Sequence, residues 1–275
     1  MTESVSNDAV DFERMTAALT AAVREHPALN GLVFLGSSSD EAVARRDEWS
    51  DHDFFAIAGL GAAAVARRDL AWLPQQENLV LTAREGEIGF VAVYDDGHVL
   101  EFAVAETAEL AGALAEEATV TVDDGDGSVA RLIAESQSRA ADLPASDALN
   151  DARLVLVKLL IGTGRLRRGE TINGGQFIRQ WAVKHLVLAL RARAGGPEPA
   201  GIDPTRRLEA VLPEVAADIE AALAQPAELA AKSLFELTRR VLEPGWDEFP
   251  TNAADAIARR LGWRASSKPR RSARS

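Results

Sequence analysis

The fold is decided by two neighbouring stretches, residues 31–39 (GLVFLGSSS) and residues 49–57 (WSDHDFFAI). The first is typical of a buried strand that ends in a loop of small residues, and the second of a strand that opens with two carboxylates. Because side chains alternate between the faces of a strand, we expect Asp51 and Asp53 on one face and His52 on the other. The two carboxylates would then lie roughly 6–7 Å apart.

The paired acids Asp51 and Asp53 indicate a cation. Two carboxylates on one face repel each other unless a positive charge lies between them. Mg²⁺ is the hard cation that suits carboxylate oxygens, and proteins usually share it with substrate phosphates. Backbone and hydroxyl groups of Gly36, Ser37 and Ser38 can hold a phosphate chain beside such an ion. The sequence therefore predicts a metal–phosphate site where this loop meets the second strand.

Composition narrows the classes of partner. The chain has 275 residues, with 42 acidic and 30 basic side chains and a formal net charge of −12. This balance argues against a nucleic-acid partner bound through its phosphates, and it would attract a cationic small substrate. The sequence contains no cysteine, which excludes disulfides, thiolate zinc sites and a cysteine nucleophile. The polar N-terminus and the lack of a long apolar run predict a cytoplasmic protein without a membrane partner.

Hydrophobic periodicity predicts a change of architecture near residues 143–146. Before that point we expect further strands at 78–83, 88–94, 98–105 and 119–122, and helices at 8–24, 62–73, 107–118 and 129–141. After it we expect only helices, at 148–162, 175–193, 213–224, 228–242 and 252–261. The predicted fold class is α+β, with a small mixed sheet flanked by helices, followed by a helical bundle. The expected domains are residues 1–143 and 144–265, and residues 266–275 are expected to be a disordered basic tail.

An apolar residue followed by Gly36-Ser37, a gap, and then Asp51-x-Asp53-apolar resembles the signature of the DNA polymerase β-like nucleotidyltransferase superfamily. The resemblance implies that the Gly-Ser loop holds a nucleoside triphosphate and that the paired carboxylates bind magnesium. It also implies a third carboxylate on a later strand, for which Glu101 is the candidate, as metal ligand and general base. Most family members carry Asp at that position. The alternative is an exposed glutamate on an edge strand.

The second half offers two further candidates. The Arg-Gly-Glu segment that contains Glu170 resembles part of the helical domain of antibiotic nucleotidyltransferases, where an acidic residue contributes to the acceptor site. The alternative for Glu170 is a helix-start residue stabilised by the helix dipole. Lys158 lies midway along an apolar helix and is a candidate phosphate contact, or a lysine that reaches solvent. His52 is expected to pack behind the strand, and His26, His98 and His185 are dispersed without metal-ligand spacing.

The resemblance implies a magnesium-dependent nucleotidyltransferase that moves AMP from ATP to a hydroxyl group. The two-domain plan resembles the aminoglycoside and lincosamide nucleotidyltransferases more than the polymerases, so the implied acceptor is a small antibiotic-like molecule, and a cationic one would suit the acidic balance. Two alternatives stay open: an antitoxin-like enzyme that modifies a protein hydroxyl, and a nucleotide-binding module of weak activity. The sequence leaves the acceptor, the nucleotide base, the general base and the choice between monomer and homodimer open.

Overall fold

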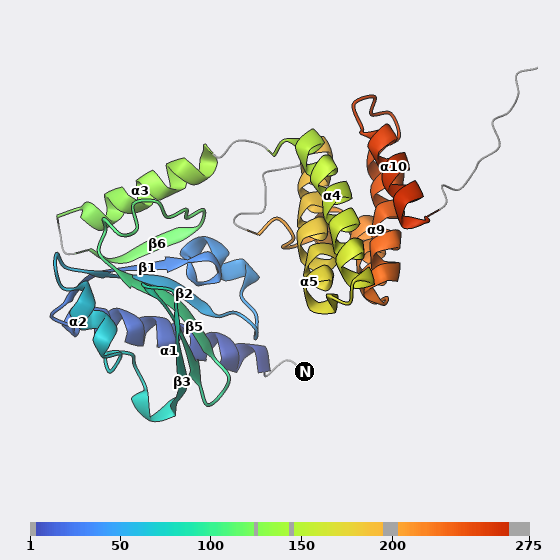
Figure 1. Ribbon diagram of the computed structural model, residues 1–275. Coiled ribbons are helices and arrows are strands. Elements are labelled where there is room, and N and C mark those ends of the chain that lie inside the picture. Colours follow the sequence, from blue (N-terminus) through green and yellow to red (C-terminus); the bar gives the residue numbers. More distant parts are fainter. Residues whose placement is uncertain (1–3, 124–125, 143–145, 195–202, 264–275) are drawn as a thin grey trace, which may run out of the picture. The chain divides into compact units, whose positions relative to one another are not determined.

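The apolar run of the opening stretch forms strand β1 (Leu29–Leu35), and the acidic stretch forms strand β2 (His52–Ala58), as predicted. The two strands pair antiparallel, with Val33 opposite Phe55. The computed structural model describes residues 4–123, 126–142, 146–194 and 203–263. The chain divides into two compact units, residues 1–143 and 144–275, and each is described by itself (Figure 1).

The described residues of the first unit form a six-stranded sheet in the order β3-β4-β5-β2-β1-β6. The remaining strands are β3 (Leu79–Glu85), β4 (Gly89–Tyr94), β5 (Val99–Ala105) and β6 (Ala118–Asp123). Strands β2 and β5 are parallel and the other neighbours are antiparallel, so the predicted mixed sheet is confirmed. Strand β5 lies inside the sheet between β4 and β2. The alternative of an edge-strand position for Glu101 is therefore wrong.

Helices cover the two faces of this sheet unequally. Helices α1 (Ser4–Glu25) and α2 (Ala63–Arg68) pack on one face, and α3 (Ser128–Ala141) packs on the other (Figure 1). The α1 side holds the larger core, which includes Leu19, Leu32, Phe54 and Leu100. The α3 side holds a smaller core, which includes Val33, Ile57, Ala105 and Ile133. Ile57 and Ala105 lie at the C-terminal ends of β2 and β5, so this core lies at that end of the two strands.

One glycine allows α3 to approach the sheet closely. A Cβ atom at Gly31 would lie 2.7 Å from Val129 Cγ2 and 2.9 Å from Ile57 Cβ. Such distances are shorter than real Cβ contacts, so a side chain at position 31 would push the helix away from β1. Close packing of α3 on the sheet therefore depends on glycine at this position.

The described residues of the second unit form helices and no strand, which confirms the α+β class. Its elements are α4 (Ala148–Arg167), α5 (Thr171–Gln176), the π-helix η4 (Phe177–Ala182), α6 (Val183–Ala194), α7 (Leu208–Val211), α8 (Pro213–Leu223), α9 (Ala227–Leu242) and α10 (Thr251–Leu261). Their apolar faces meet in one core, which includes Leu156, Leu159, Ile178, Leu186 and Leu234. The single helix expected at 175–193 is interrupted by a π turn, which periodicity alone does not reveal.

Two predicted helices differ from the structure. The segment expected to be helical at 107–118 forms successive turns, because Arg67 binds Glu109 and the carbonyl of Ala113 accepts hydrogen bonds from Ser136 and Arg139. These tertiary contacts outweigh a helix propensity that a central glycine already weakens. The helix expected at 62–73 ends at Arg68, where the side chain of Asp69 accepts a hydrogen bond from the backbone N–H of Ala71.

The basic tail expected at 266–275 lies outside the described residues, and so do residues 143–145 at the expected domain boundary. Short 3₁₀ turns complete the first unit: η1 (Gly36–Ser38), η2 (Asp40–Arg45) and η3 (Gln76–Asn78). Among the helices described, none is both long enough and apolar enough to cross a membrane.

Candidate active site

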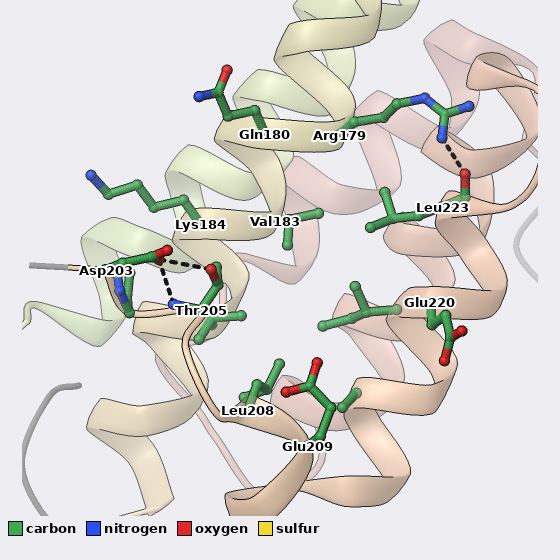
Figure 2. A pocket seen from close by; sticks show the side chains of 14 residues that line it. Arg179, Gln180, Val183, Lys184, Asp203, Thr205, Leu208, Glu209, Glu220 and Leu223 are labelled. Carbon is green, nitrogen blue, oxygen red and sulfur yellow. Dashed lines mark hydrogen bonds between the residues drawn. The ribbon is translucent and has the colours of Figure 1, made fainter. Parts of the chain in front are cut away.

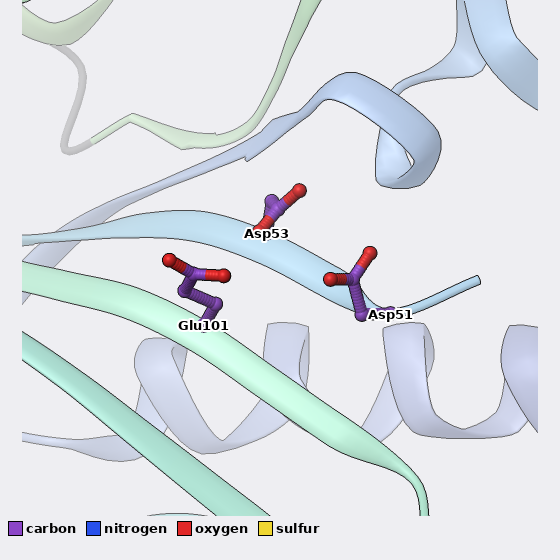
Figure 3. Close-up of side chains that lie close together, drawn as sticks. All are labelled: Asp51, Asp53 and Glu101. Atoms are coloured by element: carbon purple, nitrogen blue, oxygen red, sulfur yellow. The ribbon is translucent and has the colours of Figure 1, made fainter. Parts of the chain in front are cut away.

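Three carboxylates meet on the sheet face that carries α3. Asp51 immediately precedes β2, Asp53 is the second residue of that strand, and Glu101 comes from β5 (Figure 3). Each offers one oxygen that lies within 4.8 Å of the others. We call these residues the acidic group. The structure thus brings together the three residues that the sequence singled out as metal ligands.

Strand register explains why these residues meet. The parallel pairing of β2 with β5 sets Asp53 beside Glu101 and His52 beside Leu100. Because side chains alternate along both strands, both acids point to one face, and both neighbours point to the face that α1 covers. The small core under α3 lies at the opposite ends of these strands. The acidic group therefore remains half-buried to exposed.

The donor set fits a magnesium ion. Mg²⁺ prefers carboxylate oxygens at about 2.0–2.1 Å in an octahedron, so oxygens bound to one ion lie about 3–4 Å apart. The oxygens of the acidic group already lie within 4.8 Å of one another. Glu101 is exposed and has one more rotatable bond than aspartate, so a small rotation of its side chain can close the remaining gap. The open face leaves room for water and phosphate ligands.

The Gly-Ser loop, Gly36–Ser38, holds the start of β2. Ser37 Oγ donates to the carbonyl of Asp51 at 3.0 Å and reaches its Oδ1 at 3.2 Å. Ser38 Oγ donates to the same carbonyl at 3.0 Å and accepts from the N–H of Asp53 at 3.1 Å. Gly36 has a φ of +50°, a value that favours glycine. Both serine hydroxyls are thus bound to the acidic strand, and Ser38 is buried.

Arg46 organises the same loop, and no sequence pattern marks it, because it lies in a charged connector. Its Nε donates to the carbonyl of Ser37 at 2.9 Å, and its Nη2 donates to those of Ser38 and Ser39 at 3.1 and 3.0 Å. Its guanidinium carbon lies 4.7 Å from the centre of the Phe12 ring, and only 13% of its side chain is exposed. The guanidinium therefore fixes three consecutive carbonyls.

Behind the acidic strand, two histidines that are far apart in sequence meet. His52 is fully buried, as predicted, and its Nδ1 lies 2.7 Å from Nε2 of His98. Its Nε2 lies 2.8 Å from Oγ1 of Thr16, and its ring stacks on Phe12 at 3.8 Å. Burial, with His98 and Arg46 nearby, lowers the pKa of His52 to about 3. Burial also lowers the pKa of His98. His98, one of the histidines dispersed in the sequence, therefore forms a pair with His52 in the fold.

Glu170 and Lys158 lie in the second unit and are described apart from the acidic group. Glu170 immediately precedes α5, is exposed, and accepts a hydrogen bond from Arg168 Nε at 3.0 Å. Lys158 is half-buried on α4. Its ammonium lies 5.5 Å from the ring centre of Phe177 and 5.3 Å from that of Trp181.

Lys158 belongs to a cluster that the π-helix assembles. Phe177 and Trp181 lie four residues apart in η4, with ring centres 4.2 Å apart. Arg165 of α4 also lies over the Phe177 ring, with its guanidinium carbon 4.3 Å from the ring centre. We call these four residues the cation–aromatic cluster. Cations over aromatic faces gain electrostatic attraction, which holds the two positive side chains together on α4.

The second unit also contains a cavity of about 660 Å³, between α6, α7 and α8 (Figure 2). Its floor is apolar and includes Val183, Leu208 and Leu223, and its rim carries Lys184 and Glu209. None of the residues that the sequence predicted as functional lines it. The cavity is a separate feature from the acidic group, which lies in the first unit.

Comparison with known proteins adds little. No protein-family model matches the sequence, and comparison with curated proteins gives no match either. Among solved structures, an aminoglycoside 6-adenyltransferase from Bacillus subtilis is similar, with 9% sequence identity, 92% of each chain covered and a TM-score of 0.28. The chain's own residues carry the resemblance to the DNA polymerase β-like nucleotidyltransferases, in a Gly-Ser loop, an Asp-x-Asp strand and a third carboxylate beside it on the neighbouring strand.

Proposed function

We propose that the chain is a magnesium-dependent nucleotidyltransferase that transfers AMP from ATP to a hydroxyl group of a small molecule. One observation carries the proposal: three carboxylates from two neighbouring strands lie within 4.8 Å on an open face, beside a Gly-Ser loop. Three such groups repel one another without a cation. Metal binding gives a physical reason for their convergence.

In this proposal Asp51, Asp53 and Glu101 would hold Mg²⁺. When bound, the ion would neutralise the charge that develops on the pyrophosphate leaving group. Gly36, Ser37 and Ser38 position the triphosphate. Because both serine hydroxyls already bind Asp51 and Asp53, their main contribution is to fix the loop backbone against the acidic strand. Positioning and electrostatics account for most of the rate in transfers of this kind.

The transfer itself exchanges one bond for another. The acceptor hydroxyl oxygen forms a bond to the α-phosphorus of ATP, and the bond from that phosphorus to the bridging oxygen of pyrophosphate breaks. The hydroxyl proton passes to a carboxylate that acts as general base. Glu101 and Glu170 are the two candidates for this role. Glu101 belongs to the acidic group, whereas Glu170 is paired with Arg168 in the second unit.

Lys158 is proposed as a contact to the phosphates of ATP. Its ammonium is held over two aromatic rings and is joined by Arg165 over one of them. A positive pair on one helix is suited to an anionic ligand. The proposed acceptor is a cationic molecule of the aminoglycoside type, which would make the chain an antibiotic-resistance enzyme. Its support is the sequence resemblance and the net charge of −12.

The test is to incubate the full chain with α-labelled ATP, Mg²⁺ and a panel of aminoglycosides and lincosamides. We expect a labelled antibiotic adduct and an equal amount of pyrophosphate with at least one acceptor. Asp53→Asn serves as the inactive control and Glu85→Gln, an exposed acid on β3, as the active one. Label transfer to no member of the panel would exclude these acceptors. If Mg²⁺-dependent ATP binding were also missing, the nucleotidyltransferase proposal itself would fail.

A further inference from the structure

Behind the acidic group, on the face covered by α1, four side chains form a continuous stack. Arg46 lies over Phe12, Phe12 stacks on His52, and His52 binds His98. We call this set the positioning stack. Its members come from α1, from the connector before β2, from β2 itself and from the residue before β5. The stack therefore contacts β2, the start of β5 and, through Arg46, the Gly-Ser loop.

One placement of protons satisfies all the hydrogen bonds of the stack. In it Thr16 Oγ1 donates to the carbonyl of Phe12 at 3.1 Å and accepts from His52 Nε2 at 2.8 Å. A neutral His52 that carries its proton on Nε2 has an acceptor at Nδ1. His98 must therefore donate from Nε2 across the 2.7 Å contact. This series of hydrogen bonds runs from His98 through His52 and Thr16 to the backbone of α1.

These hydrogen bonds fix the relative position of β2 and β5, the strands that carry the acidic group. His52 lies between Asp51 and Asp53, and its ring is fully buried. His98 lies three residues before Glu101 on the neighbouring strand. The bond between the two rings therefore joins β2 to β5 beside the point where the three carboxylates face one another. Through Phe12 and Arg46 the same stack also holds the carbonyls of the Gly-Ser loop.

We propose that the positioning stack, through the bonds from His98 to His52 and from His52 to Thr16, sets the separation of the acidic group and thereby its metal affinity. This inference rests on the proposed function, because it assigns positioning residues to the same metal site. None of the stack residues touches the ion or the substrate. Partners that orient metal ligands from behind commonly change affinity by about 10–100-fold when removed. The stack acts one step further from the ion, so we expect about three- to tenfold.

The experiment measures Mn²⁺ binding to the full-length chain by electron paramagnetic resonance, without nucleotide. A matched pair lies on α1. Thr16→Val removes the acceptor of His52, whereas Thr20→Val removes a hydroxyl that donates only to the carbonyl of Thr16. We expect Thr16→Val to weaken Mn²⁺ binding about three- to tenfold and Thr20→Val to leave it within about twofold. Thermal unfolding of both variants checks that the comparison is made on folded protein.

A second pair of variants tests whether His98 donates the hydrogen bond to His52. His98→Gln keeps an N–H donor near the position of Nε2, and His98→Leu keeps the bulk without a donor. Mn²⁺ affinity should fall in the leucine variant and be largely restored in the glutamine variant. Equal affinity in Thr16→Val and Thr20→Val, or in the two His98 variants, would overturn the positioning role while leaving the metal site intact. A wild-type chain that binds no Mn²⁺ would overturn the proposed function together with this inference.

Discussion

The acidic group of the first unit and the cation–aromatic cluster of the second are built in different ways. The acidic group follows from strand periodicity, because parallel pairing of β2 with β5 places Asp53 beside Glu101. The cation–aromatic cluster depends on the π-helix η4, where hydrogen bonding from i to i+5 changes the phase of the side chains. The carboxylates are therefore brought together by regular strand pairing, whereas the two positive side chains are held by the rings of a π-helix. Charge reversal or neutralisation in each region should separate metal binding from nucleotide binding.

The largest effect is expected at the centre of the acidic group. Asp53→Asn keeps the shape of the side chain and removes one negative charge, so kcat should fall about 10³-fold or more, as for loss of a principal electrostatic element. Mn²⁺ binding should be lost in parallel. The check is kcat with the best acceptor from the panel, beside Mn²⁺ titration. Retention of both properties would remove the metal site from this face.

Glu101 is expected to give a smaller loss whose pattern identifies its role. Glu101→Gln should lower kcat about 100-fold, because it removes both a metal ligand and a candidate base. Glu101→Asp should stay within about tenfold of wild type, since a shorter carboxylate can still reach a shared ion. The pair is read by kcat and Mn²⁺ affinity. If Glu101→Gln binds Mn²⁺ normally and still loses activity, Glu101 acts as the general base and not as a metal ligand.

The same contrast explains which parts of the candidate site could be predicted from the sequence. Asp51, Asp53 and Glu101 were predictable because a period of two fixes the face of each acid and the family signature fixes their order. His52 was correctly assigned to the opposite face for the same reason. Its contact with His98 was not predictable, because it depends on which strands pair, and the two residues are forty-six positions apart in the chain.

Elsewhere the missing information was tertiary. Arg46 binds three carbonyls of the neighbouring loop, yet in sequence it is one charge among several in a connector. The turns at 107–118 replaced a predicted helix because contacts from Arg67, Ser136 and Arg139 hold that segment. The π turn in η4 has no signature in hydrophobic periodicity. Local pattern therefore identified the elements and the acids, whereas the residues that hold them needed the structure.

Lys158 tests the second region directly. Lys158→Met keeps an unbranched chain of similar length and removes the charge, so the KM for ATP should rise about tenfold with little change in kcat, as expected when ground state and transition state lose the same contact. Mn²⁺ binding without nucleotide should not change. Lys232→Met, which removes an exposed lysine on α9, is the matched control. An unchanged KM in Lys158→Met would leave Lys158 with a packing role over its two rings.

The smallest effect is expected from alanine substitutions at two glycines of α4. They test whether the cation–aromatic cluster depends on close packing between helices. A Cβ atom at Gly162 would lie 2.8 Å from Ile178 Cγ1 and 2.9 Å from Phe177 Cβ, whereas one at Gly164 would meet nothing within 4 Å. Gly162→Ala should therefore lower the free energy of unfolding by about 1–2 kcal/mol, because the contact strain exceeds the gain in helix propensity. Gly164→Ala should raise it by about 0.5–1 kcal/mol.

Urea unfolding of both alanine variants measures this difference, and the KM for ATP shows whether it reaches Lys158. A methyl group at position 162 pushes on the side chains of Ile178 and Phe177 in η4, so the Phe177 ring under the Lys158 ammonium must move. The KM should therefore rise in Gly162→Ala and stay constant in Gly164→Ala. Stabilisation by both substitutions would show that α4 and η4 separate at no cost. In that case the π turn, and not the close contact between the helices, would be what places the rings beneath Lys158.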